Sequence, residues 1–388
     1  RAVKAKNDAT ITVTAGDATE EKEEHDDILA HSKIFFQVDM VTKILSYLDL
    51  VDIGRCARVS KTLLKAIPLL ENLTITPSVT SYDGYEVNQK LRLAALRFSP
   101  ENSLASIYMY LNYARWNSSN TYSMTRILKS CQKLRHLFLR GISFVNDTFL
   151  SVSELTELET LEFECFEVED SVFDTFILVA MLKNKTNLRV LELSSETSKR
   201  NNERLSDFDE KAKEKLSELI GGLVSLRRLT INSYDILKGL DGKIIFQRLI
   251  NLEYLLLGDN LVCDEELEVI SEHCLKLREL RMHYTYGFSL AALIKVLCKC
   301  PIQVLSIRYD RETDSGLAAV REICQSCSTL THLYIYFGHD EEYQKQVSIE
   351  EDEAPLYEAV ACEASAGRTS ICFCSAYLPN KPIYWNLQ

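Results

Sequence analysis

The chain has 388 residues, of which 46% are hydrophobic and 26% charged, and this ordinary globular composition excludes collagen-like and wholly disordered proteins. A single core rarely serves a chain of this length, so we expect several domains or an array of repeats. The 44 Lys and Arg residues are outnumbered by 56 Asp and Glu residues, and the net charge of −12 argues against a broad nucleic-acid or membrane surface.

The sequence carries no recognisable targeting segment. No apolar stretch reaches the roughly 20 residues that a membrane-spanning helix requires, and residues 1–30 lack the apolar block of a secretory signal. Twelve cysteines in a long chain without such a signal are expected to stay reduced. These features predict a cytoplasmic or nuclear protein. The chain begins with Arg1 rather than Met, which suggests a fragment.

Residues 1–30 are predicted to form an acidic disordered tail. The stretch 17–27 holds seven acidic residues and one Lys, and it has no apolar face. Such a segment cannot bury enough apolar surface to offset the entropy that is lost when a chain becomes ordered.

Residues 31–68 are predicted to form a compact domain of three helices. The first helix carries an apolar face, because its hydrophobic residues recur at helical spacing. This face consists of Phe36, Met40, Val41, Ile44, Leu45 and Leu48. A second helix would carry Ile53, and a third would begin near Ser60 and end before Pro68. A domain of this size is marginal alone, so we expect it to pack against the rest of the chain.

A Leu-x-x-Leu-x-Leu frame, in which other aliphatic residues are tolerated, recurs eight times between residues 134 and 335. Successive frames start 24 to 30 residues apart, except for one interval of 38. The frames begin at Leu134, Leu158, Leu188, Leu226, Leu252, Leu277, Ile302 and Leu330. This period is typical of leucine-rich repeats, which bury their leucines by stacking on their neighbours. We therefore predict that residues 69–388 form an α/β leucine-rich-repeat solenoid of about ten strand–helix repeats, with strands on the concave side.

The remaining segments of this region follow the same scheme. Further strands are expected at residues 70–75 and 104–109, before the eight frames, and at residues 369–377, after them. The long interval holds a predicted helix over residues 205–220, which the Gly221–Gly222 pair would end. Residues 340–353 form a second acidic loop, with seven acidic residues and one Lys.

The segment Phe36–Leu63 resembles an F-box. The resemblance rests on the blocks I-L-S-Y-L-D at residues 44–49 and R-C-A-R-V-S-K at residues 55–61. The segment departs from the family pattern at its opening, where Phe-Gln replaces Leu-Pro, at Asp39 in place of Glu, and at Leu63 in place of Trp. The alternative is a three-helix cap that shields the end of the solenoid.

The repeats resemble the cysteine-containing subclass of leucine-rich repeats that is found in F-box proteins, because Cys131, Cys274 and Cys327 lie three residues before their frames. An F-box followed by such repeats implies the substrate receptor of a cullin–RING (SCF-type) ubiquitin ligase. In that family the F-box docks on a Skp adaptor, which links it to the cullin and RING subunits, and the repeats hold the protein to be ubiquitinated and degraded by the proteasome. The resemblance places the adaptor contacts at Phe36, Met40, Val41, Ile44, Leu45, Leu48 and Ile53. The alternative is a leucine-rich-repeat scaffold without a ligase.

Nothing in the sequence predicts catalysis, a cofactor or a metal. Cys324 and Cys327, with the Cys-x-Cys pairs at 298–300 and 372–374, have the residue type of zinc ligands. However, Cys327 occupies the cysteine position of its repeat, so we interpret these thiols as small buried core groups. The histidines lack His-Glu-x-x-His spacing, and no glycine-rich phosphate loop is present. The sequence therefore favours a binding protein over an enzyme.

The binding surface is expected on the concave side, where the side chains between the frame leucines point outward. Glu162, Glu164 and Glu192 make its middle acidic. A later region is basic and aromatic. It contains Arg228 and, in addition, a set of residues that we predict to bind the target. This set consists of Tyr254, Arg281, His283, Arg308, Tyr334 and Tyr336. We expect it to bind an acidic or phosphorylated segment of the target, because Arg matches carboxylate and phosphate groups. The alternative is that the arginines only neutralise Glu279 and the second acidic loop.

Overall fold

A computed structural model of the protein describes eleven stretches of the chain. They are residues 72–75, 104–110, 118–140, 146–166, 175–196, 210–232, 240–258, 262–282, 287–309, 316–337 and 354–375. The predicted tail at residues 1–30, the predicted F-box at residues 31–68, the second acidic loop and His283 lie outside these described residues.

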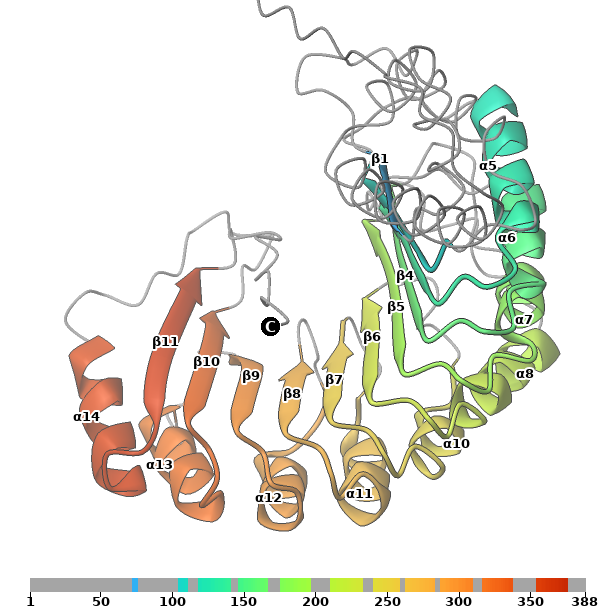
Figure 1. Ribbon diagram of the computed structural model, residues 1–388. Helices are drawn as coiled ribbons and strands as arrows, with labels where there is room; N and C mark the ends of the chain where they lie inside the picture. The colour runs from blue at the N-terminus through green and yellow to red at the C-terminus, as the bar shows by residue number, and fades with distance from the viewer. Residues whose placement is uncertain are drawn as a thin grey trace, which may run out of the picture.

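The described strands form one parallel sheet that follows the order of the sequence. The eleven strands pair from β1 to β11 without any crossover (Figure 1). They are β1 Asn72–Ile75, β2 Ser106–Tyr110, β3 His136–Arg140, β4 Thr160–Phe166, β5 Val190–Glu196, β6 Arg228–Asn232, β7 Tyr254–Leu257, β8 Glu279–Met282, β9 Val304–Tyr309, β10 His332–Phe337 and β11 Ser370–Ser375. The sheet is curved, and its strands line the inner side (Figure 1). The predicted strands are thus confirmed, including the two before the eight frames and the one after them.

The helices cover the outer side of the sheet, one between successive strands over most of its length (Figure 1). They are α5 Ser118–Ser130, α6 Asn146–Ser153, α7 Thr175–Leu182, α8 Glu210–Gly221, α10 Gly242–Phe246, α11 Asp264–His273, α12 Leu290–Lys299, α13 Gly316–Ser326 and α14 Ala354–Ser365. Among the helices that the structure describes, none combines the length and apolar character needed to span a bilayer. The alternation of strands and helices confirms the leucine-rich-repeat solenoid.

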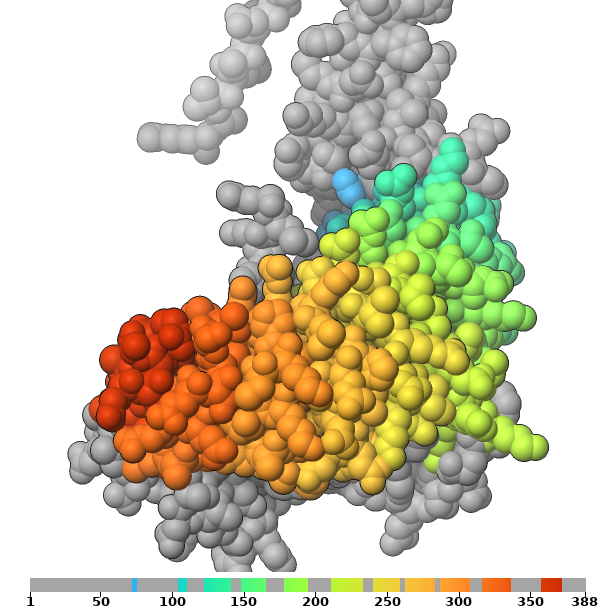
Figure 2. Space-filling view, turned by 90° about the horizontal axis from the view of Figure 1, so that it is seen from below, coloured from blue at the N-terminus to red at the C-terminus, as the bar shows by residue number. Residues whose placement is uncertain are grey.

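The frame leucines stack across the sheet and form its core. The central leucines of the eight frames are partners in successive strand pairs, and all are fully buried. They are Leu137, Leu161, Leu191, Leu229, Leu255, Leu280, Leu305 and Leu333. Each therefore contacts neighbours from two repeats, and the repeats pack side by side in chain order (Figure 2). Replacing one of them by Ala, as in Leu255→Ala, is expected to cost about 2–5 kcal/mol.

Helix α8 ends at the predicted glycine pair, although the physical reason differs from the expected one. Neither Gly221 nor Gly222 is among the described residues with positive φ, so no left-handed turn ends this helix. Instead, a Cβ atom at Gly221 would lie 2.7 Å from the carbonyl oxygen of Ile244 in α10. The glycine is therefore needed for the close approach of helices α8 and α10.

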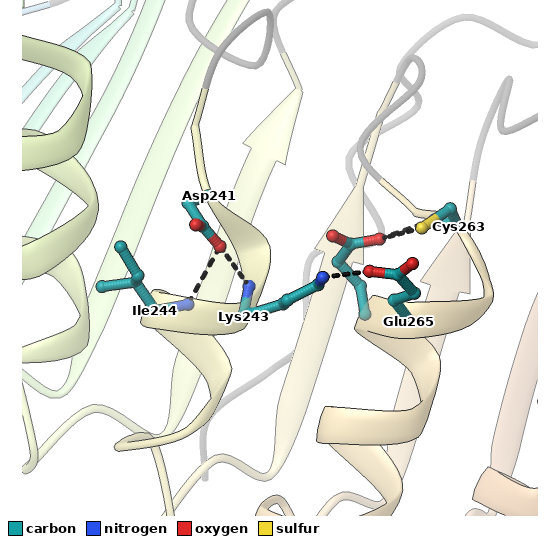
Figure 3. Close-up of polar contacts among 6 residues, drawn as sticks. Asp241, Lys243, Ile244, Cys263 and Glu265 are labelled. Carbon is teal, nitrogen blue, oxygen red and sulfur yellow. Dashed lines mark hydrogen bonds and ion pairs between the residues drawn. The ribbon is translucent and has the colours of Figure 1, made fainter. Parts of the chain in front are cut away.

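Polar contacts hold the start of α10 to the start of α11 (Figure 3). The carboxylate of Asp241 accepts hydrogen bonds from the backbone amides of Lys243 and Ile244, at 2.9 and 3.1 Å, and thereby caps α10. The ammonium of Lys243 forms an ion pair with Glu265 in the first turn of α11. Charged caps thus link neighbouring repeats on the outer side.

Cysteines at the cysteine position of the repeat, or one residue from it in the case of Cys300, supply buried hydrogen-bond donors. The thiols of Cys274, Cys300 and Cys327 point at carbonyl oxygens of the preceding repeat, with Sγ–O distances of 3.7, 3.5 and 3.3 Å. Burial raises the pKa of Cys131 and Cys274 to about 12 and that of Cys300 to about 11. These thiols therefore stay protonated at neutral pH, which suits a structural role.

Lys185 occupies the same position in its own repeat, three residues before Leu188. Its side chain is buried, with 1% of the residue exposed. The ammonium donates to the carbonyl oxygens of Val152 and Ser153 at the end of α6, at 2.8 and 3.0 Å. A cation at the carboxyl end of a helix is favourable, because it meets the negative end of the helix dipole. Burial nevertheless lowers the pKa of Lys185 to about 8.

Candidate functional site on the concave sheet

The outward side chains of the parallel strands form rows across the concave side of the sheet. Because the strands pair in register, residues at equivalent positions lie beside one another. The middle row runs through Tyr108, Phe138, Glu162, Glu192, Thr230, Leu256, Arg281, Ser306 and Tyr334. In β3, β7 and β8 the outward residues alternate with fully buried ones, as the frame predicts. Strands β3 to β5 and β6 to β10 carry different chemistry.

We define the acidic zone as Arg140 of β3, Glu162 and Glu164 of β4, and Glu192 of β5. The guanidinium of Arg140 lies 3.5 Å from a carboxylate oxygen of Glu162, 3.4 Å from one of Glu164 and 3.7 Å from one of Glu192. The three carboxylate side chains are only 15 to 16% exposed. One positive charge is therefore shared among three largely buried carboxylates.

The electrostatics of the acidic zone are dominated by burial and by like charge. Burial, followed by the nearby charge of Glu192, raises the pKa of Glu162 to about 7, against the opposing effect of Arg140 and Arg228. Burial by itself would lower the pKa of Arg140, but the three carboxylates reverse this and raise it above its ordinary value. Arg140 therefore stays charged, whereas Glu162 exchanges its proton near neutral pH.

We define the basic zone as Arg228, Tyr254, Glu279, Arg281 and Tyr334. Nη2 and Nε of Arg281 lie 2.5 and 2.6 Å from one carboxylate oxygen of Glu279. The same guanidinium is 5.9 Å from the ring centroids of Tyr254 and Tyr334. The guanidinium of Arg228 stacks 3.9 Å from the centroid of Tyr254. Burial raises the pKa of the Tyr254 phenol, so it remains a neutral hydrogen-bonding group.

The structure brings together three of the six predicted target-binding residues, namely Tyr254, Arg281 and Tyr334. Arg308 and Tyr336 are register partners in β9 and β10, which places their backbones beside one another. The close contact of Arg281 with Glu279 is the pairing that the alternative interpretation expects. The predicted adaptor contacts, from Phe36 to Ile53, lie outside the described residues.

Sequence reasoning missed several features of this surface. The rings of Tyr108 and Phe138 stack beside Glu162, with centroids 4.3 Å apart and an interplanar angle of 12°. In addition, the hydroxyl of Thr230 and Nε of Arg228 are buried without a hydrogen-bond partner. The frame places Tyr108 on the concave side, so the sequence alone could have identified this residue. The unpaired atoms of Thr230 and Arg228 could not be predicted from the sequence.

The acidic zone differs from a metal site. Within the described stretches, no three His, Cys, Asp or Glu side chains are grouped so as to hold a metal ion. The carboxylates of the acidic zone instead surround a guanidinium. Such a surface can bind charged side chains of another protein by ion pairs and hydrogen bonds.

Comparison with known proteins adds an independent finding. The family model of the F-box domain matches residues 38–73, so the match ends within β1. A search of curated protein sequences finds no significant match. The chain therefore combines an F-box domain with a leucine-rich-repeat solenoid, which is the architecture of the F-box/leucine-rich-repeat family.

Several solved structures of low sequence identity match this chain. One is a chain of the Rad7 and Elc1 complex in yeast, which is 12% identical, covers 86% of this chain and 96% of that chain, and has a TM-score of 0.47. A second is a protein from Bacteroides fragilis, with 14% identity, coverages of 63% and 68%, and a TM-score of 0.38. A third is the leucine-rich-repeat-containing protein LegL7 from Legionella pneumophila, with 14% identity, coverages of 79% and 91%, and a TM-score of 0.39.

Proposed function

We propose that the chain is the non-catalytic substrate receptor of a cullin–RING (SCF-type) ubiquitin ligase. The F-box at residues 31–68 docks on a Skp-type adaptor and, through it, on the cullin and RING subunits. The repeats at residues 69–388 hold the target on the concave sheet for ubiquitination and degradation by the proteasome. The observation that carries this proposal is the F-box match at residues 38–73, directly ahead of the solenoid. Such a receptor would work in the cytoplasm or the nucleus.

The proposal requires an apolar helix face that the adaptor covers. The residues that recur at helical spacing, among them Met40, Ile44, Leu45 and Leu48, provide such a face. Buried apolar anchors supply most of the affinity of a protein interface, so charges placed there should prevent docking. We predict that Ile44→Asp together with Leu48→Asp abolishes co-purification of a co-expressed Skp adaptor.

A matched control lies on the opposite face of the same predicted helix. Thr42→Asp with Ser46→Asp introduces the same charge at the same spacing, and adaptor recovery should persist. Circular dichroism and the melting temperature of both double variants report whether the repeats stay folded. Full adaptor recovery by the Ile44/Leu48 variant would sink the F-box assignment and favour the rival function, a scaffold that binds its partner without a ligase.

Within this proposal the basic zone binds an acidic or phosphorylated segment of the target, together with His283, Arg308 and Tyr336. Arg and Tyr are over-represented at the centres of interfaces, where they supply directed hydrogen bonds and large contact area. The test replaces Arg281 and Arg308 by Glu and compares the captured proteins with those of the wild type. Adaptor recovery should persist while a defined set of targets is lost; an unchanged set would place target recognition elsewhere.

A further inference from the structure

Two carboxylates of the acidic zone, those of Glu162 and Glu192, form no close ion pair with Arg140. Charge-assisted hydrogen bonds between guanidinium and carboxylate groups are usually about 2.7–2.9 Å long. The contacts of Arg140 with Glu162, Glu164 and Glu192 are all longer, at 3.4 to 3.7 Å. The guanidinium therefore approaches neither Glu162 nor Glu192 closely, which leaves these two carboxylates attractive to a further cation.

A hydroxyl group beside these carboxylates also lacks a partner. Thr230 of β6 is the register partner of Glu192, and it lies between the buried core residues Leu229 and Ile231, so its side chain faces the concave side. The residue is 4% exposed and its hydroxyl makes no hydrogen bond. Buried polar groups are normally paired, and an unpaired one is costly, so the exception calls for an explanation. A bound donor group next to Glu192 would provide it.

The stacked rings of Tyr108 and Phe138 border the acidic zone on its other side. Tyr108 is 38% exposed, although it is a large aromatic residue, and Phe138 is the register partner of Glu162. The methylene groups of a long basic side chain pack well on such rings, and its charged end is attracted to their faces. Aromatic rings, carboxylates and an unpaired hydroxyl thus follow one another along the middle row.

We infer that the acidic zone binds a lysine or arginine side chain of the target protein, with the charged group beside the carboxylates of Glu162 and Glu192 and the stem against Phe138. This inference rests on the proposed function, because it assumes that the concave sheet holds a target. It assigns the two zones of the sheet opposite partners: a basic residue at the acidic zone and an acidic or phosphorylated one at the basic zone. The target segment would then be bipolar.

A cationic ligand should also be coupled to the ionisation of Glu162. The charged groups that face Glu162 are Arg140 from β3, Glu164 on its own strand, Glu192 from β5 and Arg228 from β6. With the pKa of Glu162 near 7, a bound cation would favour loss of its proton. Affinity for a basic side chain should therefore rise as the pH increases from about 6 to 8.

The experiment measures binding of a fluorescent Gly-Ser peptide that carries two arginines and two lysines to the full chain, by anisotropy at constant salt. A peptide with glutamates in place of the basic residues is the ligand control. We expect saturable binding of the basic peptide alone, and a loss of about tenfold or more in the variant Glu162→Gln/Glu192→Gln, as when one side of a charge pair is truncated at an interface.

The matched variant Glu253→Gln/Glu363→Gln removes the same charge from exposed positions on the rim and on α14, and it should bind like the wild type. Three outcomes would overturn the inference. They are a failure of the basic peptide to bind the wild type, binding to the Glu162/Glu192 variant that is as tight as to the wild type, and a loss of affinity in the rim variant that is as large as in the Glu162/Glu192 variant. If the Glu162/Glu192 variant unfolds, the pH profile of the wild type decides, and a flat profile refutes the inference. Because this assay needs no adaptor, it can fail while adaptor recovery persists, and the reverse also holds.

Discussion

The acidic zone and the basic zone lie on the same face of one sheet, yet they use their charges differently. In the acidic zone a single guanidinium is shared by three carboxylates at 3.4 to 3.7 Å. In the basic zone Arg281 contacts Glu279 at 2.5 Å, and the rings of Tyr254 and Tyr334 flank it. Formal charge alone would make both zones attractive to ligands. The contacts show that Arg281 of the basic zone is held in a close ion pair, whereas Arg140 of the acidic zone forms only longer contacts.

The largest expected effect comes from removing the one cation of the acidic zone. Arg140→Met removes the guanidinium that contacts Glu162, Glu164 and Glu192, and removing one partner of a buried ion pair is strongly destabilising. We expect a loss of about 3 kcal/mol in the free energy of unfolding at pH 7, measured by urea titration. The loss should shrink at pH 5, where Glu162 binds a proton.

The control for this variant is Arg135→Met, because the side chain of Arg135 is 60% exposed and its contact with Glu159 is long, at 3.9 Å. Such a surface pair is worth less than about 1 kcal/mol. Equal losses from the two substitutions would mean that Arg140 is not the counter-ion that holds the acidic zone together.

The corresponding change in the basic zone should be smaller. Arg281→Met removes the partner of one carboxylate, that of Glu279, whereas Arg140→Met affects three. We therefore expect a loss of about 2 kcal/mol in the free energy of unfolding. The double variant Glu279→Gln/Arg281→Met removes both charges and should recover part of this loss, as a double-mutant cycle would show. If Arg281→Met costs more than Arg140→Met, the comparison between the zones is reversed.

The smallest effect concerns pH. The folded-state pKa of Glu162, about 7, lies above its ordinary value of 4.5, so the folded form binds more protons than the unfolded form between these pH values. The contribution of Glu162 therefore favours the folded state at low pH and is lost as the pH rises from about 4.5 to 7. We expect Glu162→Gln to remove about 1–2 kcal/mol of pH dependence across this window. Identical pH profiles for wild type and variant would place the Glu162 pKa near its ordinary value.

The repeat architecture was predictable because one local rule is repeated in the sequence. Leu137, Leu229 and Leu305 are each fully buried, and each lies at the same place in its frame, so periodicity alone identified strands, core and concave side. The contacts within the concave surface were not predictable in the same way. Arg140 meets Glu192 across two strand steps, and only the register and the rotamers of three separate repeats bring them together.

Two further positions show where residue type misleads. Lys185 performs the hydrogen bonding of the repeat cysteine, but no pattern of cysteines can reveal it, because what the site requires is a buried donor rather than a thiol. The Gly221–Gly222 pair correctly predicted where α8 ends. The reason for the glycine is the close approach of α10, and this packing between repeats cannot be inferred from the local sequence.

The burial of Lys185 makes one amine a reporter of how the array opens. An acylating reagent reaches it only when the repeats that contain α6 and β5 separate, since its ammonium is held against Val152 and Ser153. Lys215 and Lys295 lie on the outer helices, with side chains 56% exposed, and should react at once. In a solenoid each repeat contacts only its neighbours. Slow labelling of Lys185 would therefore measure the rate at which two adjacent repeats separate while the rest of the chain stays folded.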